Sequence, residues 1–282
     1  KNSGVELELG YKINRGDFDF GTNLNVSYIK NELVDLGNAD GFESKDNVHQ
    51  IGNVSRAENG QPYPFFYGWS TNGILQNESE ADAYNKQYGQ SAVPGDVRFV
   101  DYNRDGALTD DDMHNIGNGY PKVTFGWNFN ASYKNFDFSM LISGAFGGKI
   151  ADVTRRLDCD YVNLPAEFMD RWHGEGTSNK IPRFTFPGKD SNRNWGRFSD
   201  LYIHNGDYAR IKNIQLGYTL PATLTRKFFV SRLRLYVSAE NLFTFTGYKG
   251  LDPELANDAA PGIDRGYYPQ ARTYTVGFNL NF

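Results

Sequence analysis

The 282-residue sequence has no long hydrophobic run, and this absence limits the ways in which the chain could cross a membrane. Hydrophobic residues make up 39% of it and the mean hydropathy is −0.60. No stretch approaches the roughly 20 apolar residues that a spanning helix needs. If the chain crosses a bilayer, it must do so as a closed barrel, because in lipid every backbone polar group needs an internal partner.

Cysteine, histidine and net charge are also scarce. The single cysteine, Cys159, excludes an internal disulfide framework and a four-cysteine zinc site. A net charge of −5 argues against nucleic acid as a partner. The four histidines show no H-E-x-x-H spacing, and no residues nominate a catalytic triad: His49, His114, His173 and His204. An enzyme is therefore not expected.

Aromatic residues are abundant, at 15% of the chain, and they recur with a two-residue period. In the last ten residues, 273–282, apolar and small polar side chains alternate without a break. Successive strand residues point to opposite faces of a sheet, so this period predicts strands with one apolar face. The same pattern predicts strands at 4–13, 18–30, 122–133, 136–146, 208–220, 231–242 and 273–282.

Lipid outside and water inside would produce these two faces, and so would a soluble β-sandwich. Glu, Lys and Arg recur on the polar face, which is unusual for a packed core and suits a wet lumen or a solvated sheet face. An aromatic terminal residue, Phe282, is common in bacterial outer-membrane barrels and favours the barrel.

Short and long connections alternate between the strands. Residues 14–16, 134–135 and 221–230 form short turns, whereas 31–121, 147–207 and 243–272 are long. If the strands alternate in direction, all short turns lie at one end, as periplasmic turns do, and all long loops lie at the other. This scheme needs an even number of strands within 31–121. A weak pair at 46–56 and 62–72, turning at Asn59-Gly60, would supply them.

The sequence thus predicts an all-β fold: the C-terminal part, about nine strands, of a large antiparallel transmembrane β-barrel with long extracellular loops. The chain starts at Lys1 with no secretory signal, which indicates a mature product or a piece of a longer protein. Residues 1–282 are expected to form one C-terminal barrel portion, with the early strands outside this chain.

A calcium-type motif lies in the first long connection, at residues 101–112. It follows the twelve-residue EF-hand spacing, with oxygen ligands at positions 1, 3, 5, 7, 9 and 12 and glycine, Gly106, at position 6. Hard oxygen ligands suit Ca²⁺, with Mg²⁺ second, although position 12 is aspartate where glutamate is usual. The alternative is an acidic loop that holds no ion. The predicted ligands are Asp101, Asn103, Asp105, Ala107, Thr109 and Asp112.

Three stretches resemble one family, the SusC/RagA-type TonB-dependent outer-membrane transporters of Bacteroidetes-like bacteria. The first is Pro94-Gly95-Asp96-Val97-Arg98-Phe99 running into the Asp105-Gly106 loop and the hairpin at 133–137. The second is 206–221, with Ala209-Arg210-Ile211-Lys212-Asn213, and the third is Ala239-Glu240-Asn241-Leu242-Phe243 followed by Gly250-Leu251-Asp252-Pro253-Glu254. Together they cover nearly the whole chain.

The resemblance implies a barrel of about 22 strands, the size class of plugged transporters. It also implies a SusD-like surface lipoprotein as a lid, energy coupling through TonB, and oligosaccharides or peptides as cargo in an outer membrane. No plug domain and no TonB-contacting segment are present in this sequence, so both belong to the expected parent protein.

Four aromatic residues in the predicted loops are candidates for stacking on cargo: Tyr161, Trp172, Trp195 and Tyr202. The alternative is packing within the loops or contact with the partner lid, and it is favoured for them. Two rival functions also stay open, namely a soluble extracellular calcium-containing glycan-binding β-protein and a passive porin. Extraction from membranes only with detergent, with migration on gels that changes on heating, would distinguish a barrel from the soluble protein. Dependence of uptake on the proton-motive force would distinguish an active importer from a porin.

Overall fold

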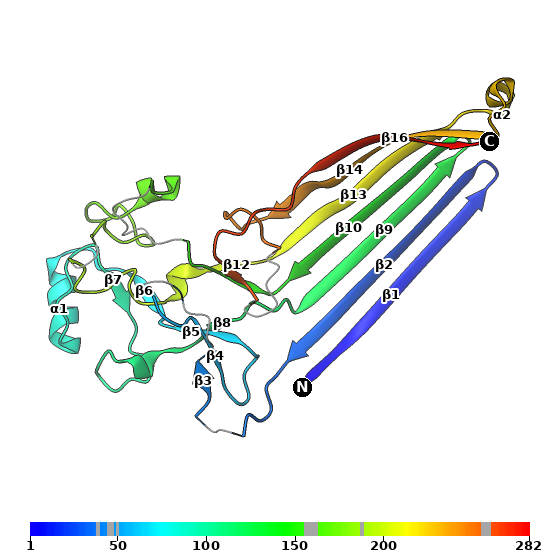
Figure 1. Cartoon of the computed structure of the whole chain (residues 1–282). Coiled ribbons are helices and arrows are strands. Elements are labelled where there is room, and N and C mark those ends of the chain that lie inside the picture. Colours follow the sequence, from blue (N-terminus) through cyan, green and yellow to red (C-terminus); the bar gives the residue numbers. More distant parts are fainter. Residues whose placement is uncertain (38–39, 44–47, 49–50, 155–162, 187–188, 255–260) are drawn as a thin grey trace.

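A computed structural model describes residues 1–282 except 38–39, 44–47, 49–50, 155–162, 187–188 and 255–260. Its main feature is a seven-stranded antiparallel sheet in the order β1-β2-β9-β10-β13-β14-β16 (Figure 1). The strands are β1 (Asn2–Arg15), β2 (Phe18–Asn31), β9 (Val123–Tyr133), β10 (Phe136–Phe146), β13 (Tyr208–Thr219), β14 (Arg232–Thr246) and β16 (Thr273–Asn281). All seven strongly alternating segments are therefore confirmed as strands of one sheet.

The ends of this sheet differ as the sequence predicted. The short turns, α2 (Ala222–Thr225) and the C-terminus lie at one end, whereas the N-terminus and the elements of the long connections lie at the other (Figure 1). The sheet is open, with β1 and β16 as its edges. In the part of the chain that the structure describes, no helix has both the length and the apolar character to span a bilayer.

The prediction of two further sheet strands at 46–56 and 62–72 is wrong. Residues 46–47 and 49–50 lie outside the described residues. The structure has β4 (Ser55–Ala57) at the end of the first range and β5 (Phe65–Gly68) in the second, which do pair antiparallel but belong to a separate sheet, β3-β4-β5-β8. These strands are too short to span a membrane, which takes about 9–11 residues. Since β2 pairs directly with β9, the main sheet has seven strands where about nine were expected.

The remaining strands and helix α1 belong to the long connections. Besides β4 and β5 they are β3 (Phe42–Glu43), β6 (Thr71–Ile74), α1 (Glu78–Tyr88), β7 (Val97–Phe99), β8 (His114–Gly117), β11 (Lys149–Asp152), β12 (Ile203–Asn205) and β15 (Ile263–Asp264). β12, β11 and β15 form a third small sheet, and β6 pairs with β7. Asn77 caps the start of α1, and Gly89, in the left-handed region, ends it.

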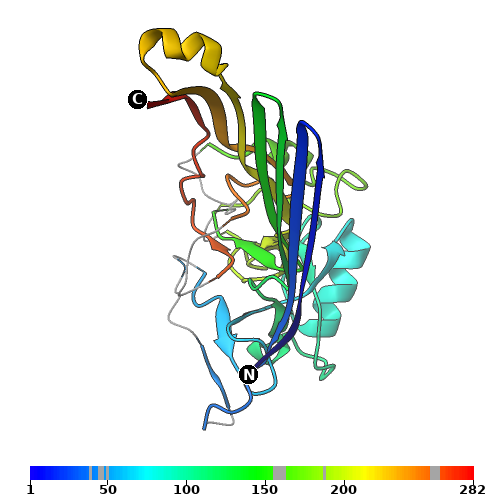
Figure 2. The same cartoon turned by 90° about the vertical axis from the view of Figure 1, so that its right-hand side faces the viewer.

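The long connections have hydrophobic cores of their own. One includes Val54, Phe66, Trp195, Phe198 and Tyr202, all nearly inaccessible to solvent. The other, around α1, includes Trp69, Leu75, Tyr84, Val97 and Phe99. The main sheet, drawn from another side in Figure 2, instead leaves its apolar side chains half-buried or exposed. Packing therefore orders the connections into a compact loop assembly, while the sheet has an uncovered apolar face.

A β-bulge keeps that face continuous. Ile211 pairs with Phe243, but Asn213 pairs with Glu240, so Asn241 and Leu242 together oppose Lys212. Asn241 adopts a left-handed φ of 51°, which asparagine tolerates better than most residues. Because β13 also shifts against β10 here, Ile211 and Ile214 both fall on the apolar face although they are three residues apart.

Candidate functional site

The candidate site is the polar face of the main sheet and its junction with the loop assembly. Register places the polar rows of adjacent strands side by side: for example, Asp137 pairs with Gly217, which pairs with Tyr236. Most members of this face are short amides and hydroxyls: Asn23, Asn25, Asn128, Asn130, Ser139, Asn213, Gln215, Ser238, Thr275, Asn279 and Asn281. Such a face can hydrogen-bond a hydrated, neutral solute along its length.

One charge pair on this face lies near the short-turn end. Arg234 on β14 donates from Nε to Oδ1 of Asp137 on β10 at 2.9 Å, reaching across β13. The crossing passes over Gly217, where an added Cβ would overlap both side chains. The guanidinium of Arg234 also lies 5.2 Å from the centre of the Tyr236 ring. A glycine on the middle strand thus lets the outer two strands share a charge pair.

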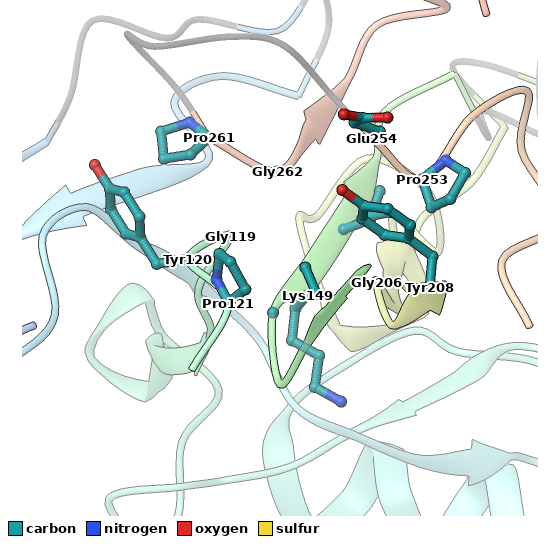
Figure 3. A pocket seen from close by; sticks show the side chains of 13 residues that line it. Gly119, Tyr120, Pro121, Lys149, Gly206, Tyr208, Pro253, Glu254, Pro261 and Gly262 are labelled. Carbon is teal, nitrogen blue, oxygen red and sulfur yellow. The ribbon is translucent and has the colours of Figure 1, made fainter. Parts of the chain in front are cut away.

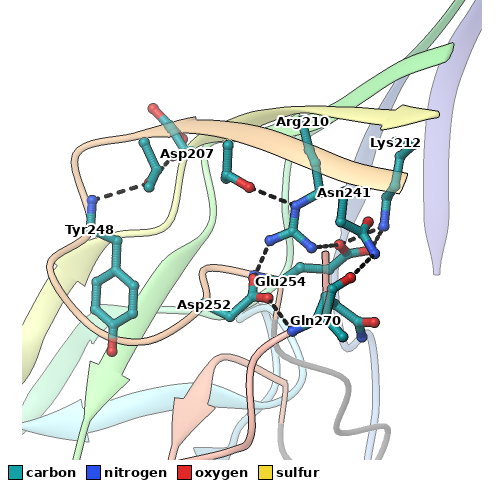
Figure 4. A network of polar contacts seen from close by, with 11 residues as sticks. Asp207, Arg210, Lys212, Asn241, Tyr248, Asp252, Glu254 and Gln270 are labelled. Carbon is teal, nitrogen blue, oxygen red and sulfur yellow. Dashed lines mark hydrogen bonds and ion pairs between the residues drawn. The ribbon is translucent and has the colours of Figure 1, made fainter. Parts of the chain in front are cut away.

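A second, larger network joins the sheet to the connection that follows β14 (Figure 4). Arg210, whose side chain is only 3% exposed, forms ion pairs with Asp252 and Glu254, the latter at 2.8 Å, and donates to Oγ1 of Thr244 at 2.8 Å. Lys212 donates to Glu254 at 2.6 Å. A buried guanidinium with three partners is a demanding arrangement, because losing one partner leaves charge unpaired in a low dielectric.

Asp252 is held by backbone groups as well. Its two carboxylate oxygens accept from the N–H groups of Glu254 and Gln270, each at 2.9 Å. Burial acts to raise the pKa of Asp252, but these two N–H groups and Arg210 together hold that pKa below its ordinary value. The carboxylate therefore stays ionised and fixes both ends of the 252–270 segment to β13.

A cavity of about 180 Å³ opens beside this network (Figure 3). Tyr120 and Pro261 line one side, while Tyr208 and Glu254 line the other. Its walls are rich in glycine, which brings backbones close: an added Cβ at Gly119 would collide with the backbone of Pro261 and Gly262. The cavity can admit a few waters or a small polar group next to the Glu254 carboxylate.

A wider cavity, of about 690 Å³, lies among the loops. Its lining includes Asp152, Glu167, Asp170, His204 and Lys249. The Tyr248 hydroxyl, which lines the same cavity, donates to Asp264 at 2.7 Å; burial and this bond raise the pKa of Tyr248. The charged side chains in its lining are thus more often acidic than basic.

The structure places the six predicted metal ligands in one tight loop, with Gly106 at a φ of 86°. Asp101, Asn103 and Asp105 accept from nearby backbone N–H groups of that loop. Asp112 is fully buried, and its oxygens accept from the N–H groups of Tyr102, Asn103 and Thr109. Among the described residues no group of three or more acidic, histidine or cysteine side chains is drawn together for a metal. Metal binding stays a prediction.

The structure describes three of the four candidate stacking residues, and it buries two of them. Tyr161 lies outside the described residues. Trp195 and Tyr202 are 1% and 0% exposed, and the Tyr202 hydroxyl donates to the Trp195 carbonyl at 2.6 Å. Trp172 is half-buried beside Gly95. Trp195 and Tyr202 pack inside the loop assembly, so their rings offer no open face to a ligand.

No protein-family model matches the chain. Curated relatives nevertheless match along all of it: TonB-dependent receptor P3 of Formosa agariphila is 31% identical, and TonB-dependent receptor SusC of Bacteroides thetaiotaomicron is 27% identical. A solved RagAB peptide transporter has the same fold over the whole chain, with a TM-score of 0.73 and 22% identity. The predicted resemblance to SusC/RagA-type TonB-dependent receptors is confirmed.

The match covers a minor share of these receptors. The chain spans 29% of the length of receptor P3, 26% of SusC and 29% of the RagAB transporter chain. A second RagAB structure, a peptide importer in an "open-open" state, agrees at a TM-score of 0.72. The receptors' names describe transport and reception, and none of them names an enzyme.

The sequence did not nominate the Arg210 network as a site. Its members lie in two stretches that carry the family resemblance, but 42 and 44 residues separate Arg210 from its two carboxylates. The sequence offers only two local hints of this network: an arginine, Arg210, on the polar row of a strand, and a later turn that contains the acidic residues Asp252 and Glu254. Pairing across such a distance depends on how the long connection folds back.

Proposed function

We propose that this chain forms part of the wall and loops of an outer-membrane nutrient importer. The importer takes up oligosaccharides or peptides, with a SusD-like lipoprotein as lid and energy coupling through TonB. The supporting observation is the two-faced seven-stranded sheet, whose apolar face is exposed and whose short turns all lie at one end. Lipid covers such an apolar face in a transmembrane barrel.

The open edges support a larger barrel. β1 and β16 each have one unpaired side, and a spanning sheet has no free edges in lipid. In this proposal the remaining strands and the plug of the parent receptor complete the wall and fill it. The polar face then lines the interior, where hydrated cargo and plug meet amides, hydroxyls and the paired charges.

The names of the relatives support the proposed transport and the proposed coupling to TonB. Receptors named for TonB match over the whole chain, and the fold neighbour named RagAB is a peptide transporter. We assign either cargo class to this chain, because the polar face combines neutral amides, which suit sugars, with fixed charges, which suit peptides.

The experiment uses the full-length receptor in its own cells. We expect it in the outer-membrane fraction, extracted only by detergent, with migration on gels that changes on heating. Uptake of a labelled oligosaccharide or peptide should stop when the proton-motive force is collapsed. Recovery in the soluble fraction would contradict the barrel, and uptake that persists without the proton-motive force would indicate a porin.

A further inference from the structure

The connection between β13 and β14 carries exposed apolar side chains at the short-turn end of the sheet. It consists of α2 followed by a short 3-10 helix, η4 (Arg226–Phe228). Leu224 is half exposed, Phe228 is 75% exposed and Phe229 is 90% exposed. Phe229 has a φ of 59°, which ends the helical stretch. Two adjacent, largely exposed phenylalanines in a turn are costly in water, so this turn is expected to contact an apolar neighbour.

The turn is fixed to the edge of the apolar face. Ser231 donates from both its N–H and its Oγ to the carbonyl of Asn281, at 2.8 and 3.0 Å, and Leu220 N–H donates to the Leu233 carbonyl at 2.9 Å. Figures 1 and 2 both place α2 beside the C-terminus. Leu280 and Phe282 on the apolar row are exposed there as well. The exposed phenylalanines thus extend the surface that we assign to lipid.

Basic side chains surround the same end of the sheet. Every short turn contributes at least one: Arg15, Lys134, Arg226 and Lys227, with Arg232 at the start of β14. All five are exposed. Within the part of the chain that the structure describes, no ion pair involves them. Of the nearby acids, Asp137 is paired with Arg234 and Asp19 accepts from Asn14.

We infer that the 221–231 turn anchors the protein in the membrane interface by binding anionic phospholipid. Leu224, Phe228 and Phe229 enter the boundary between headgroups and acyl chains, and Arg226 and Lys227 bind headgroup phosphates. Aromatic side chains favour this boundary, and basic side chains next to an apolar patch associate with anionic headgroups. The inference rests on the proposed function, because it requires the main sheet to span the bilayer.

The position of the turn can be tested with spin labels in the full-length receptor, reconstituted in vesicles with its native cysteines replaced. Labels at Phe228→Cys and Phe229→Cys should be more accessible to oxygen, which concentrates in lipid, than to a water-soluble nickel complex. Tyr268→Cys, a 92% exposed position in a long connection, is the aqueous control. Val237→Cys, on the apolar face of β14, is the lipid control.

The labels distinguish failure of the proposed lipid anchor from failure of the proposed function. If the label at Val237 reports lipid while the labels at Phe228 and Phe229 report water, the anchor is wrong and the barrel stands. If the label at Val237 also reports water, the proposed function itself fails. Protection of Phe228 from both reagents would mean that protein covers the turn, which overturns the lipid assignment.

The charges are tested by lipid composition. Adding phosphatidylglycerol to phosphatidylcholine vesicles should raise the thermal midpoint of the receptor at low salt. The double variant Arg226→Gln/Lys227→Gln should lose most of that rise, and high salt should remove it from the native protein. The control variant Lys86→Gln, on α1, should keep it. An equal rise with inorganic phosphate, or an unchanged rise in the double variant, would overturn the inference.

Discussion

At the scale of single residues, the arginine at position 210 links the barrel wall to the loops. Its guanidinium contacts a neighbouring strand through Thr244 and a distant connection through Asp252 and Glu254. Hydrogen bonds to charged groups are stronger than neutral ones, and a planar guanidinium can satisfy several acceptors at once. Arg210 therefore has a positional role that lysine could not fill.

Replacing Arg210 with glutamine should destabilise the folded receptor by about 3–5 kcal/mol, because the buried Asp252 carboxylate loses its countercharge. Denaturant unfolding in detergent micelles measures this cost, and hydrogen exchange should rise in 248–254. The control is Lys30→Gln, whose exposed pair with Glu32 contributes about 0–1 kcal/mol. Equal costs for the two variants would show that burial of the pair contributes nothing.

The same network predicts an acid limit to stability. The pKa of Asp252 is lowered in the folded state, so its contribution is fully present above the unfolded pKa of about 3.9 and is lost as pH falls through the folded pKa. The native receptor should exceed Asp252→Asn in thermal midpoint near neutral pH, and the difference should shrink on acidification. If the difference in thermal midpoint stays constant down to pH 3, protonation of Asp252 does not cause the loss of stability in acid, and the prediction is wrong.

At the scale of elements, the seven long strands were predictable because each has a strict two-residue period and a continuous apolar row. The short strands of the loop assembly were not. β4 has only three residues and β5 buries residues on both faces, so neither shows the long alternation that marks a membrane strand. Helix α1 has only two buried positions, Ala81 and Tyr84, and its Asn77 and Gly89 caps are its clearest sequence signal.

The candidate site likewise has one part that the sequence predicts and another part that only the folded structure reveals. Local spacing identified the 101–112 loop, whose backbone turn the structure reproduces. Spacing could not identify Arg210 with Asp252, or Arg234 with Asp137, since those pairs form only when separate strands and connections meet. The burial of Trp195 and Tyr202 likewise depends on the third dimension.

We propose that the 101–112 loop binds Ca²⁺ weakly, with a dissociation constant on the order of 10⁻⁴–10⁻³ M, the range of extracellular sites. Asp112 already caps the backbone and is the poorest ligand of the set. Titration calorimetry on the full receptor should show binding that Asp105→Asn abolishes, whereas Asp82→Asn on α1 keeps it. Calcium should also slow hydrogen exchange in the loop. Absence of both effects would establish the loop as metal-free.

At the scale of the whole molecule, the sheet and the loop assembly differ in how they place their apolar side chains. The connections bury some of their aromatic side chains in two cores of their own, while the sheet leaves Val5, Leu7, Val276 and Phe278 exposed. A freely dissolved protein of this size would cover such a row, because burying apolar area is the main favourable term in folding. The contrast indicates that the two halves meet different solvents.

A pair of neighbouring substitutions can decide which solvent covers the sheet. Val237 lies on the apolar face of β14, opposite Leu216 and Val276, and Ser238 lies on the polar face, opposite Gln215 and Thr275. If lipid covers the apolar face, Val237→Lys should destabilise the receptor by about 2–4 kcal/mol, the cost of a lysine near the bilayer midplane. Ser238→Lys should cost far less, since its side chain stays on the hydrated side.

Unfolding of both variants from vesicles measures the difference. The comparison discriminates because Val237 is already 50% exposed, so in water a lysine there would change stability by only about 0.5 kcal/mol. A large cost for Val237→Lys alone therefore requires a surrounding medium that rejects charge. Small, equal costs for the two variants would place water on both faces of the sheet, and the importer assignment would have to be abandoned.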